Sequence, residues 1–444
     1  MNGSELYAKT APMKLFFMIA IPGAISMIAS SLWGLFDGIF VGHLLGGDAF
    51  AALNLAFPFV LIVFSVADMI GVGSAVSISI FLGKKDEHNA NNYFTCACII
   101  IFGFGFMIGA VLYILAPLFM KLMGADANLT ELGVAYLRVY ALTAPLTTMT
   151  FSVDNYLRIC GKIKGSMYLN ILMSALILGF EYLCLGVLGM GIGGSALAVS
   201  IGMFICTVVA LCPFVQGRLT LRFTKPRFHS HMVRQMIIAG SPNFLSNIAG
   251  RLTSIVMNTV LLRIGDATAV SVYGILVYAG DTLQQLLYGT CDGMQPAIGY
   301  NWGARDMGRV KGLFHCSTAA CAIISVAGVV LMLLIPETIV SLFIQKGETE
   351  LIHISSYALK IYGWTFLTRW FGFAVQSFFV AIDKPLPATV LSLSNALVVP
   401  ILLLPALWSL GLDGIWLNTP ITSVIVSLTA VFFFIRIKQH MASC

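Results

Sequence analysis

The sequence feature that most constrains the fold is an internal repeat with an offset of about 220 residues. Both copies are hydrophobic and keep the same register from end to end, which a chance match would not do. The matched pairs are Pro22 with Pro242, Asp48 with Asp266, Gly73 with Gly293, Gly83 with Gly303, and Gly189 with Gly411. Many secondary transporters consist of two such halves around a central site, because rocking of the halves gives alternating access. The repeat therefore predicts two similar lobes and favours a transporter.

The composition predicts an integral membrane protein. Hydrophobic residues make up 59% of the chain and charged residues 10%, and the mean hydropathy is +0.93. A bilayer core of about 30 Å is crossed by about 20 apolar residues in a helix, and the chain has twelve stretches of at least that length. They are 15–43, 49–82, 93–121, 129–160, 163–187, 192–215, 232–264, 267–300, 313–335, 351–382, 386–410 and 414–435. We expect an all-α fold with twelve transmembrane helices.

Lysine and arginine residues predict the orientation in the membrane, because cytoplasmic loops are enriched in them. They gather in every second loop, whereas the opposite loops hold only Lys121, Arg263 and Lys346. Both termini are therefore expected in the cytoplasm of a cell, most simply a prokaryotic one, whose membrane the chain crosses many times. Each half has an even number of spans, so the two six-helix bundles are parallel repeats. The net charge of +6 follows from this topology and does not indicate a nucleic-acid partner.

The most polar stretch in the middle of the chain separates the halves. We predict an N-terminal lobe at 1–215, a cytoplasmic linker at 216–231 and a C-terminal lobe at 232–444. Arg222, Lys225 and Arg227 in this linker could contact anionic membrane lipids. The topology rule alone explains them equally well.

Motifs for catalysis or cofactors are not recognisable in the sequence. The ten cysteines are scattered and have no metal-ligand spacing. There is no phosphate-binding loop of the Walker type and no nucleophile motif. We therefore expect neither a metal, a cofactor nor an enzymatic activity.

Ionisable residues inside the spans are the main candidates for function, because they cost several kcal/mol in lipid unless they line a cavity, pair or move charge. The first half contributes Asp37, Asp68, Asp154 and Glu181, and the second contributes Arg251, Asp281, Asp292 and Arg369. The repeat places Met257, Gln376 and Leu403 opposite Asp37, Asp154 and Glu181. Coupling chemistry is therefore predicted in the first lobe.

Asp37 and Glu181 each end a partly polar helical stripe. Ser26, Ser30, Trp33 and Asp37 share one face, and Asn170, Ser174, Ile177 and Glu181 share another. Two carboxylates in one cavity of low dielectric constant cannot both stay ionised cheaply, so a proton or a cation should accompany them. The predicted cavity residues are Trp33, Asn155, Asn170 and Ser174. The simpler alternative is that each acid caps a helix or bonds to backbone freed by a kink.

Three further positions have competing interpretations. Asp154 is a candidate for ion coupling, but Arg158 lies four residues later and predicts a local ion pair. Pro22 could be a hinge or a static kink. Arg251 and Arg369 could neutralise Asp281 or Asp292 in structural pairs, which we slightly favour, or contact substrate.

Several runs resemble the multidrug and toxic compound extrusion (MATE) family over the whole chain. They are Phe36-Asp37-Gly38 with Val41-Gly42, Asn155 to Arg158 with Gly161, Leu188 to Ala196, and Gln295-Pro296 through Gly299-Tyr300-Asn301 to Gly303-Ala304. The resemblance implies two six-helix bundles in a V shape. It also implies efflux of organic, often cationic, compounds in exchange for H⁺ or Na⁺.

Within that family the chain looks most like the DinF-like branch, which implies a coupling site at Asp37 and Glu181. An aspartate is more typical than Glu181, and the usual Asn and Thr of the site are replaced by Ile177 and Val199, with Ser200 next to the latter. The loss of oxygen ligands favours protons over Na⁺. A lipid-linked oligosaccharide flippase of the same superfamily is the alternative. We expect a monomer whose partners are small organic substrates.

Overall fold

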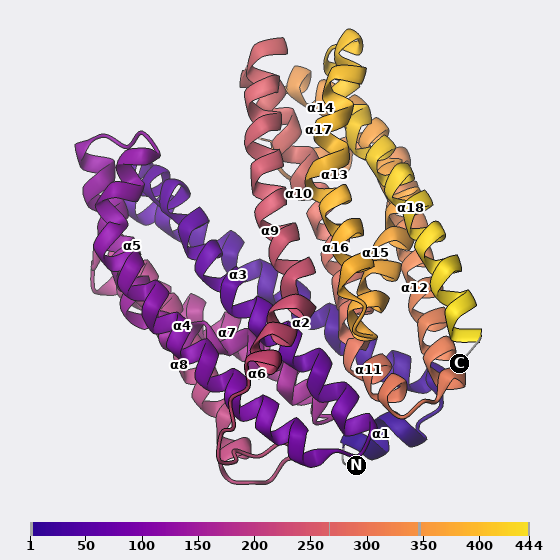
Figure 1. Ribbon diagram of the computed structural model, residues 1–444. Helices are drawn as coiled ribbons and strands as arrows, with labels where there is room; N and C mark the ends of the chain where they lie inside the picture. The colour runs from indigo at the N-terminus through magenta and orange to yellow at the C-terminus, as the bar shows by residue number, and fades with distance from the viewer. Residues whose placement is uncertain (1–2, 266, 345–347, 443–444) are drawn as a thin grey trace. The chain divides into compact units, whose positions relative to one another are not determined.

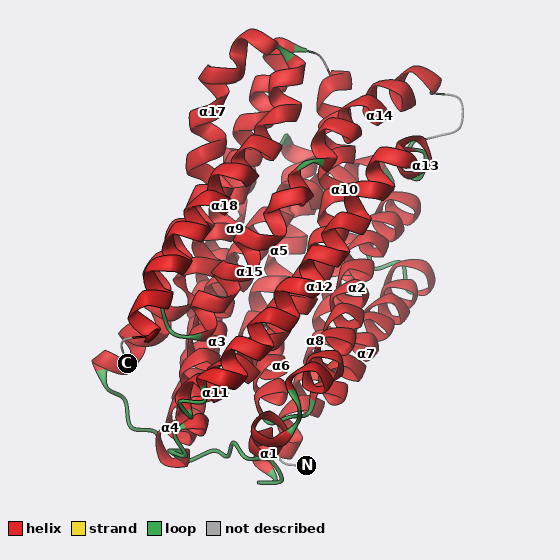
Figure 2. Ribbon diagram, turned by 90° about the vertical axis from the view of Figure 1, so that its right-hand side faces the viewer, coloured by secondary structure: helices red, strands yellow, loops and turns green. Residues whose placement is uncertain are grey.

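The computed structural model describes residues 3–265, 267–344 and 348–442, so Asp266 and Lys346 lie outside the described residues. Within these ranges all regular structure is helical (Figure 2). Among the described residues, eight helical segments are long and apolar enough to cross a membrane. The predicted all-α membrane fold is confirmed.

The predicted spans of the first half all correspond to helices. After a short helix α1 (Gly3–Lys9), they are α2 (Pro12–Leu45), α3 (Gly47–Gly83), α4 (Glu87–Leu122), α5 (Ala127–Thr147) with α6 (Met149–Ile159), α7 (Ile163–Glu181) with the π-helix η1 (Tyr182–Val187), and α8 (Gly191–Val215). The fourth span is interrupted at Thr148, three residues after Pro145. Proline cannot donate the helical hydrogen bond, which weakens the turn around it.

The second half has the same sequence of spans with more interruptions. They are α9 (Ser230–Ile264), α10 (Ala267–Cys291) with η2 (Asp292–Met294) and α11 (Gln295–Gly303), α12 (Met307–Leu334), α14 (Thr349–Gly363) with α15 (Thr365–Ala381), α16 (Pro385–Leu393) with η3 (Ser394–Val398), α17 (Val399–Leu407) and η4 (Trp408–Leu410), and α18 (Leu412–Ala442). A short helix, α13 (Pro336–Val340), follows α12.

Contacts divide the chain into two compact units. Unit 1 contains Met1–Ala11, Ile25–Gly240 and Gly299–Asp306, and unit 2 contains Pro12–Ala24, Ser241–Ile298 and Met307–Cys444. Each unit thus combines most of one sequence half with short segments from elsewhere. The borders inside α2 and α9 both lie beside a proline, Pro22 and Pro242. Because each proline removes one helical hydrogen bond, both helices are weakened where they leave one unit for the other.

Small residues allow close helix packing in unit 1. The helix α4 packs along α5 (Figure 1), and a Cβ atom added to Gly109 of α4 would lie 2.4 Å from the carbonyl oxygen of Ala141 of α5. Gly105, one turn earlier, approaches the Cα of Pro145 in the same way. Such contacts are typical of membrane helices, which associate through backbone proximity more than through the hydrophobic effect.

The linker after α8 is bound to α4 by side-chain amides. The Asn92 carboxamide accepts a hydrogen bond from the Arg227 backbone nitrogen at 2.8 Å and donates one to the Arg227 carbonyl oxygen at 3.0 Å. Asn91 accepts from the Arg222 backbone nitrogen at 2.7 Å. The linker is therefore a docked strap on α4.

Asn92→Ala is expected to lower the free energy of unfolding of the purified protein by about 1–3 kcal/mol, because the carboxamide of the buried Asn92 makes two hydrogen bonds to the Arg227 backbone. Thermal or denaturant unfolding in detergent measures this. The matched control is Asn128→Ala, which removes an exposed bond to Asp48 and should change stability by less than about 0.5 kcal/mol. Equal stability of the two variants would contradict a docked linker.

Candidate functional site

A buried group of polar side chains in unit 1 surrounds Asp37 and Glu181. The four helices α2, α5, α7 and α8 supply them. We call this group the carboxylate cluster: Asp37, Tyr136, Tyr140, Glu181 and Ser195. Asp37 is 3% exposed and Glu181 is 0% exposed, so bulk water does not hydrate either carboxyl group.

The hydrogen bonding in the carboxylate cluster is incomplete. The Ser195 hydroxyl donates to Asp37 Oδ1 at 2.6 Å. Both carboxyl oxygens of Glu181 and the hydroxyls of Tyr136 and Tyr140 are buried without a hydrogen-bond partner among the described residues. Asp37 and Glu181 interact electrostatically with each other and with both tyrosines. The cluster is therefore polar and buried, and most of its side-chain oxygens have no hydrogen bond.

The charge balance of the carboxylate cluster determines what it can do. Among the described residues neither Asp37 nor Glu181 forms an ion pair with a lysine or arginine. An uncompensated carboxylate is very costly in a medium of low dielectric constant. Burying both acids in their ionised form without a counter-charge would therefore be costly.

Glu181 lies where the helix geometry changes. This residue is the last of α7, and the π-helix η1 begins directly after it. A π-helix has a wider turn than an α-helix and is frequently found at functional sites. Cys184 of η1 is buried, so the wider turn packs against the bundle next to the acid.

Asp154 lies in a separate buried network. Its Oδ2 is 2.8 Å from the Arg158 guanidinium, and its Oδ1 accepts from Ser166 at 2.5 Å and from Asn170 at 3.1 Å. The ion pair that the sequence offered as the alternative for Asp154 is present. Its role in ion coupling stays a prediction.

The other predicted site residues are spread along unit 1. Asn170 accepts from Ser30 at 3.3 Å, and the Ser174 hydroxyl donates to the Ala29 carbonyl oxygen at 2.8 Å, so both connect α7 to α2. Ser200 shares a hydrogen bond of 2.8 Å with Thr143 and makes none to either acid. Trp33 and Asn155 are half-buried.

In unit 2, the acids and arginines that the sequence singled out lie on several helices, α9, η2, α10 and α15. Asp292 accepts hydrogen bonds from Gln295 at 2.8 Å and from Ser377 at 2.7 Å. Within the described residues, neither Arg251 nor Arg369 has an ion pair or a hydrogen bond. Arg369 and Arg251 do interact electrostatically with Asp281, and the choice between structural neutralisation and substrate contact stays a prediction.

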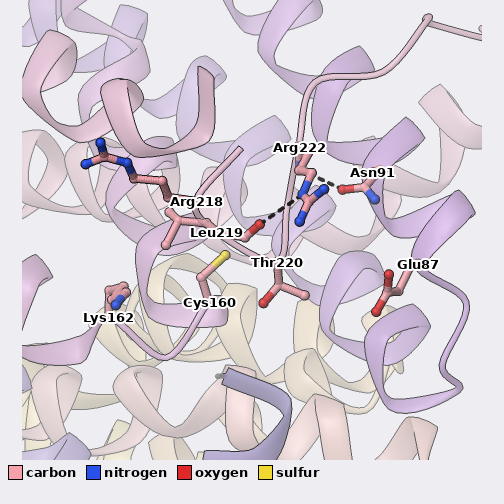
Figure 3. Close-up of a pocket in the computed structure, with 8 residues that line it drawn as sticks. All are labelled: Glu87, Asn91, Cys160, Lys162, Arg218, Leu219, Thr220 and Arg222. Carbon is pink, nitrogen blue, oxygen red and sulfur yellow. Dashed lines mark hydrogen bonds between the residues drawn. The ribbon is translucent and has the colours of Figure 1, made fainter. Parts of the chain in front are cut away.

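A pocket of about 470 Å³ lies at the other end of α8. It is lined by Glu87, Asn91, Cys160, Lys162, Arg218, Leu219, Thr220 and Arg222 (Figure 3). From Ser195 to its end, α8 is about 30 Å long at 1.5 Å per residue, so the pocket is remote from the carboxylate cluster. Its charged residues belong to the start of α4, to the loop before α7 and to the linker, and none belongs to the carboxylate cluster.

Comparison with known proteins identifies the family of this chain. The MatE family model matches residues 22–183 and 242–405, which is one segment in each half. The chain belongs to the MatE family of transporters. It is 24% identical over 457 residues to the multidrug export protein MepA of Staphylococcus aureus (strain MSSA476), and the match covers 99% of this chain and 98% of MepA.

Solved structures share the fold of this MatE protein. A MATE in complex with MaL6 superposes with a TM-score of 0.94 at 20% identity, covering 100% of this chain and 99% of the other. A MATE in a bent conformation gives a TM-score of 0.90 at 22% identity, with 99% of both chains covered. The expected resemblance to the MATE family is confirmed.

Three members of the carboxylate cluster in this MatE protein were not singled out as site residues from the sequence. Ser195 lies in the glycine-rich start of α8, and Tyr136 and Tyr140 are one turn apart on α5. Spacing places the two tyrosines on one helix face. The spacing does not indicate that this helix face lies near Asp37 and Glu181.

Proposed function

We propose that this MatE protein is a secondary active antiporter that exports small organic compounds, often cationic ones, in exchange for an inward-moving ion. The observation that carries the proposal is the pair of buried acids, Asp37 and Glu181, with no cationic side chain paired to either among the described residues. Such a pair binds a positive ion when closed and releases it when opened to water. MepA, with which the chain aligns over nearly its whole length, is a multidrug export protein.

A proton is the coupling ion that the chemistry favours. A Na⁺ site requires several oxygen ligands around the ion. The positions beside the acids on α7 and α8 carry the buried aliphatic residues Ile177 and Val199. Proton transfer needs only the carboxyls and one hydrogen-bond donor, which Ser195 supplies. The proposed site, Asp37 and Glu181, is at the position that the resemblance to the DinF-like branch implies. It differs in having Ile177 and Val199 in place of the usual Asn and Thr.

The helix α2 links the charge at Asp37 to a possible bend at Pro22. Pro22 lies fifteen residues before Asp37 in α2 and two residues before the border between the units at Ala24. A change of charge at Asp37 alters the cost of burying that helix end, and the weakened turn at Pro22 lets α2 bend in response. Solved MATE structures include a bent and a straight conformation.

The membrane setting follows from the charge distribution. We propose a monomer in the cell membrane with both termini and the linker in the cytoplasm, as the basic loops indicate. The docked strap then lies at the lipid surface, where Arg222, Lys225 and Arg227 are exposed and can contact anionic head groups.

The test is uptake of ethidium into proteoliposomes under a proton gradient or a Na⁺ gradient imposed separately. Uptake driven by the proton gradient alone is the expected result. Uptake driven by the Na⁺ gradient alone would overturn the choice of the proton, while the proposal of an antiporter would stand. No uptake under either gradient would contradict the antiporter and make a lipid-linked substrate the next to test.

A further inference from the structure

The pocket of Figure 3 lies at the end of unit 1 that is remote from the carboxylate cluster. We call it the linker pocket and define it by the eight residues drawn there. Its volume of about 470 Å³ is within the range of pockets that hold small molecules. Three parts of unit 1 form it: the start of α4, the loop between α6 and α7, and the linker. They contribute the charged side chains of Glu87, Lys162, Arg218 and Arg222.

Hydrogen bonds hold the linker side of the pocket in place. The Arg222 backbone nitrogen donates to Asn91 Oδ1 at 2.7 Å, and the Thr224 backbone nitrogen donates to the Thr95 hydroxyl at 3.0 Å. Leu219, between the two arginines of the pocket, is buried. The backbone that carries these arginines is therefore fixed on α4, and the pocket is preformed rather than a chance feature of a loose loop.

The cations of the linker pocket have no anionic partner in the protein. Among the described residues, Lys162, Arg218 and Arg222 form no ion pair. The Arg222 Nε lies 3.5 Å from a backbone carbonyl oxygen, which leaves the terminal guanidinium nitrogens as donors. In Figure 3, Lys162 and Arg218 lie to the left of Cys160. Arg222 and Glu87 lie to its right. Three cations thus surround one hollow against a single acid.

This charge arrangement needs an explanation beyond topology. The enrichment of cytoplasmic loops in lysine and arginine accounts for the presence of the cations. It does not require that cations from the α6–α7 loop and from the linker meet in one pocket, where like charges repel each other. An anion in the pocket would remove that repulsion and give the free donors their acceptors.

A phosphate group matches the donors of the pocket. At pH 7 a phosphate ester carries a charge of about −1.5 to −2 and has three strong acceptor oxygens. Guanidinium groups bind such oxygens through two parallel hydrogen bonds, and an ammonium group adds a point charge. A carboxylate has only one charge and two oxygens, so it would leave more of the repulsion among the three cations.

We infer that the linker pocket binds a phosphate group, carried either by a soluble small molecule or by a lipid head group. Arg218 and Arg222 hold the phosphate oxygens, and Lys162 adds charge from the α6–α7 loop. The bound anion then joins the linker to that loop. The inference is independent of the proposed antiport, because the pocket shares no residue with the carboxylate cluster. It also differs from a contact of the exposed linker with head groups, which needs no pocket.

Two probes with the same phosphate chemistry test the pocket and distinguish the two sources. They are inorganic phosphate and dioctanoyl phosphatidic acid, with dioctanoyl phosphatidylcholine as the control for the acyl chains. Binding to the purified protein in a neutral detergent is measured by calorimetric titration at constant ionic strength. Arg222→Gln should weaken binding at least about tenfold, because it removes charged hydrogen bonds. Glu87→Gln should tighten binding about threefold, because it removes a negative charge from the pocket.

The matched control is Lys225→Gln, an exposed cation of the same linker that does not line the pocket. It should change the affinity by less than about twofold, because solvent and salt screen its charge. Binding of inorganic phosphate identifies a soluble ligand, and binding of phosphatidic acid alone identifies a lipid head group; either result supports the site. Binding of neither probe would overturn the inference. Equal weakening by Lys225→Gln and Arg222→Gln would also overturn it, since it would show a diffuse basic surface.

Discussion

Asp37→Asn and Glu181→Gln are each expected to reduce gradient-driven ethidium uptake by at least about tenfold. The amide side chains have nearly the same shape as the acids but cannot take up or release a proton. Asn at position 37 can still accept the hydrogen bond from Ser195, so the fold should be retained. The measurement is uptake into proteoliposomes under an imposed proton gradient, with each variant reconstituted to the same density.

The matched control for these variants is Asp48→Asn. Asp48 is an exposed aspartate in unit 1 whose side chain accepts a hydrogen bond from Asn128. It should transport as well as the unaltered protein. If Asp37→Asn retains transport and its dependence on the proton gradient, the carboxylate cluster is not the coupling site.

The unfolding temperature of the Glu181→Gln protein is a second, independent measurement. Glu181 is fully buried with neither oxygen hydrogen-bonded, so a neutral amide at this position loses no partner seen in the structure. Glu181→Gln is therefore expected to unfold at a temperature equal to or above that of the unaltered protein. Loss of transport without loss of stability is the combination that a coupling role predicts.

The fold was predictable because apolar stretches of this length have one stable form in a bilayer. Every predicted span is matched by helices. The breaks at Thr148 and Trp364 were not predicted, since the apolar pattern runs through both positions without interruption. A break of this kind depends on what the neighbouring helices can pack against, which hydropathy does not record.

The candidate site was predictable only in part. Acids inside spans are rare enough to single out Asp37 and Glu181 from the sequence alone. Their partners are Ser195, Tyr136 and Tyr140, which are ordinary residues for membrane helices and acquire their role from tertiary packing. For Arg369 the sequence indicated the charge and offered Asp281 or Asp292 as its partner; in the structure Arg369 interacts electrostatically with Asp281.

Arg158→Met is expected to cause the largest loss of stability, about 3–5 kcal/mol in the free energy of unfolding. The substitution leaves the Asp154 carboxylate buried without its cation, and removing one member of a buried pair costs this much. The exposed pair of Lys9 and Glu5 has the same i,i+4 spacing in the same unit. Lys9→Met should therefore change stability by less than about 0.5 kcal/mol, because solvent screens that pair.

Adding Asp154→Asn to Arg158→Met should restore much of the lost stability, since the unpaired charge disappears while Ser166 and Asn170 keep an oxygen to bond. Equal unfolding of the Arg158→Met and Lys9→Met proteins would rule out a structural pair. Transport decides the remaining question about Asp154. If Asp154→Asn with Arg158→Met still takes up ethidium under a proton gradient, the predicted coupling role of Asp154 is excluded, and the coupling chemistry is confined to Asp37 and Glu181.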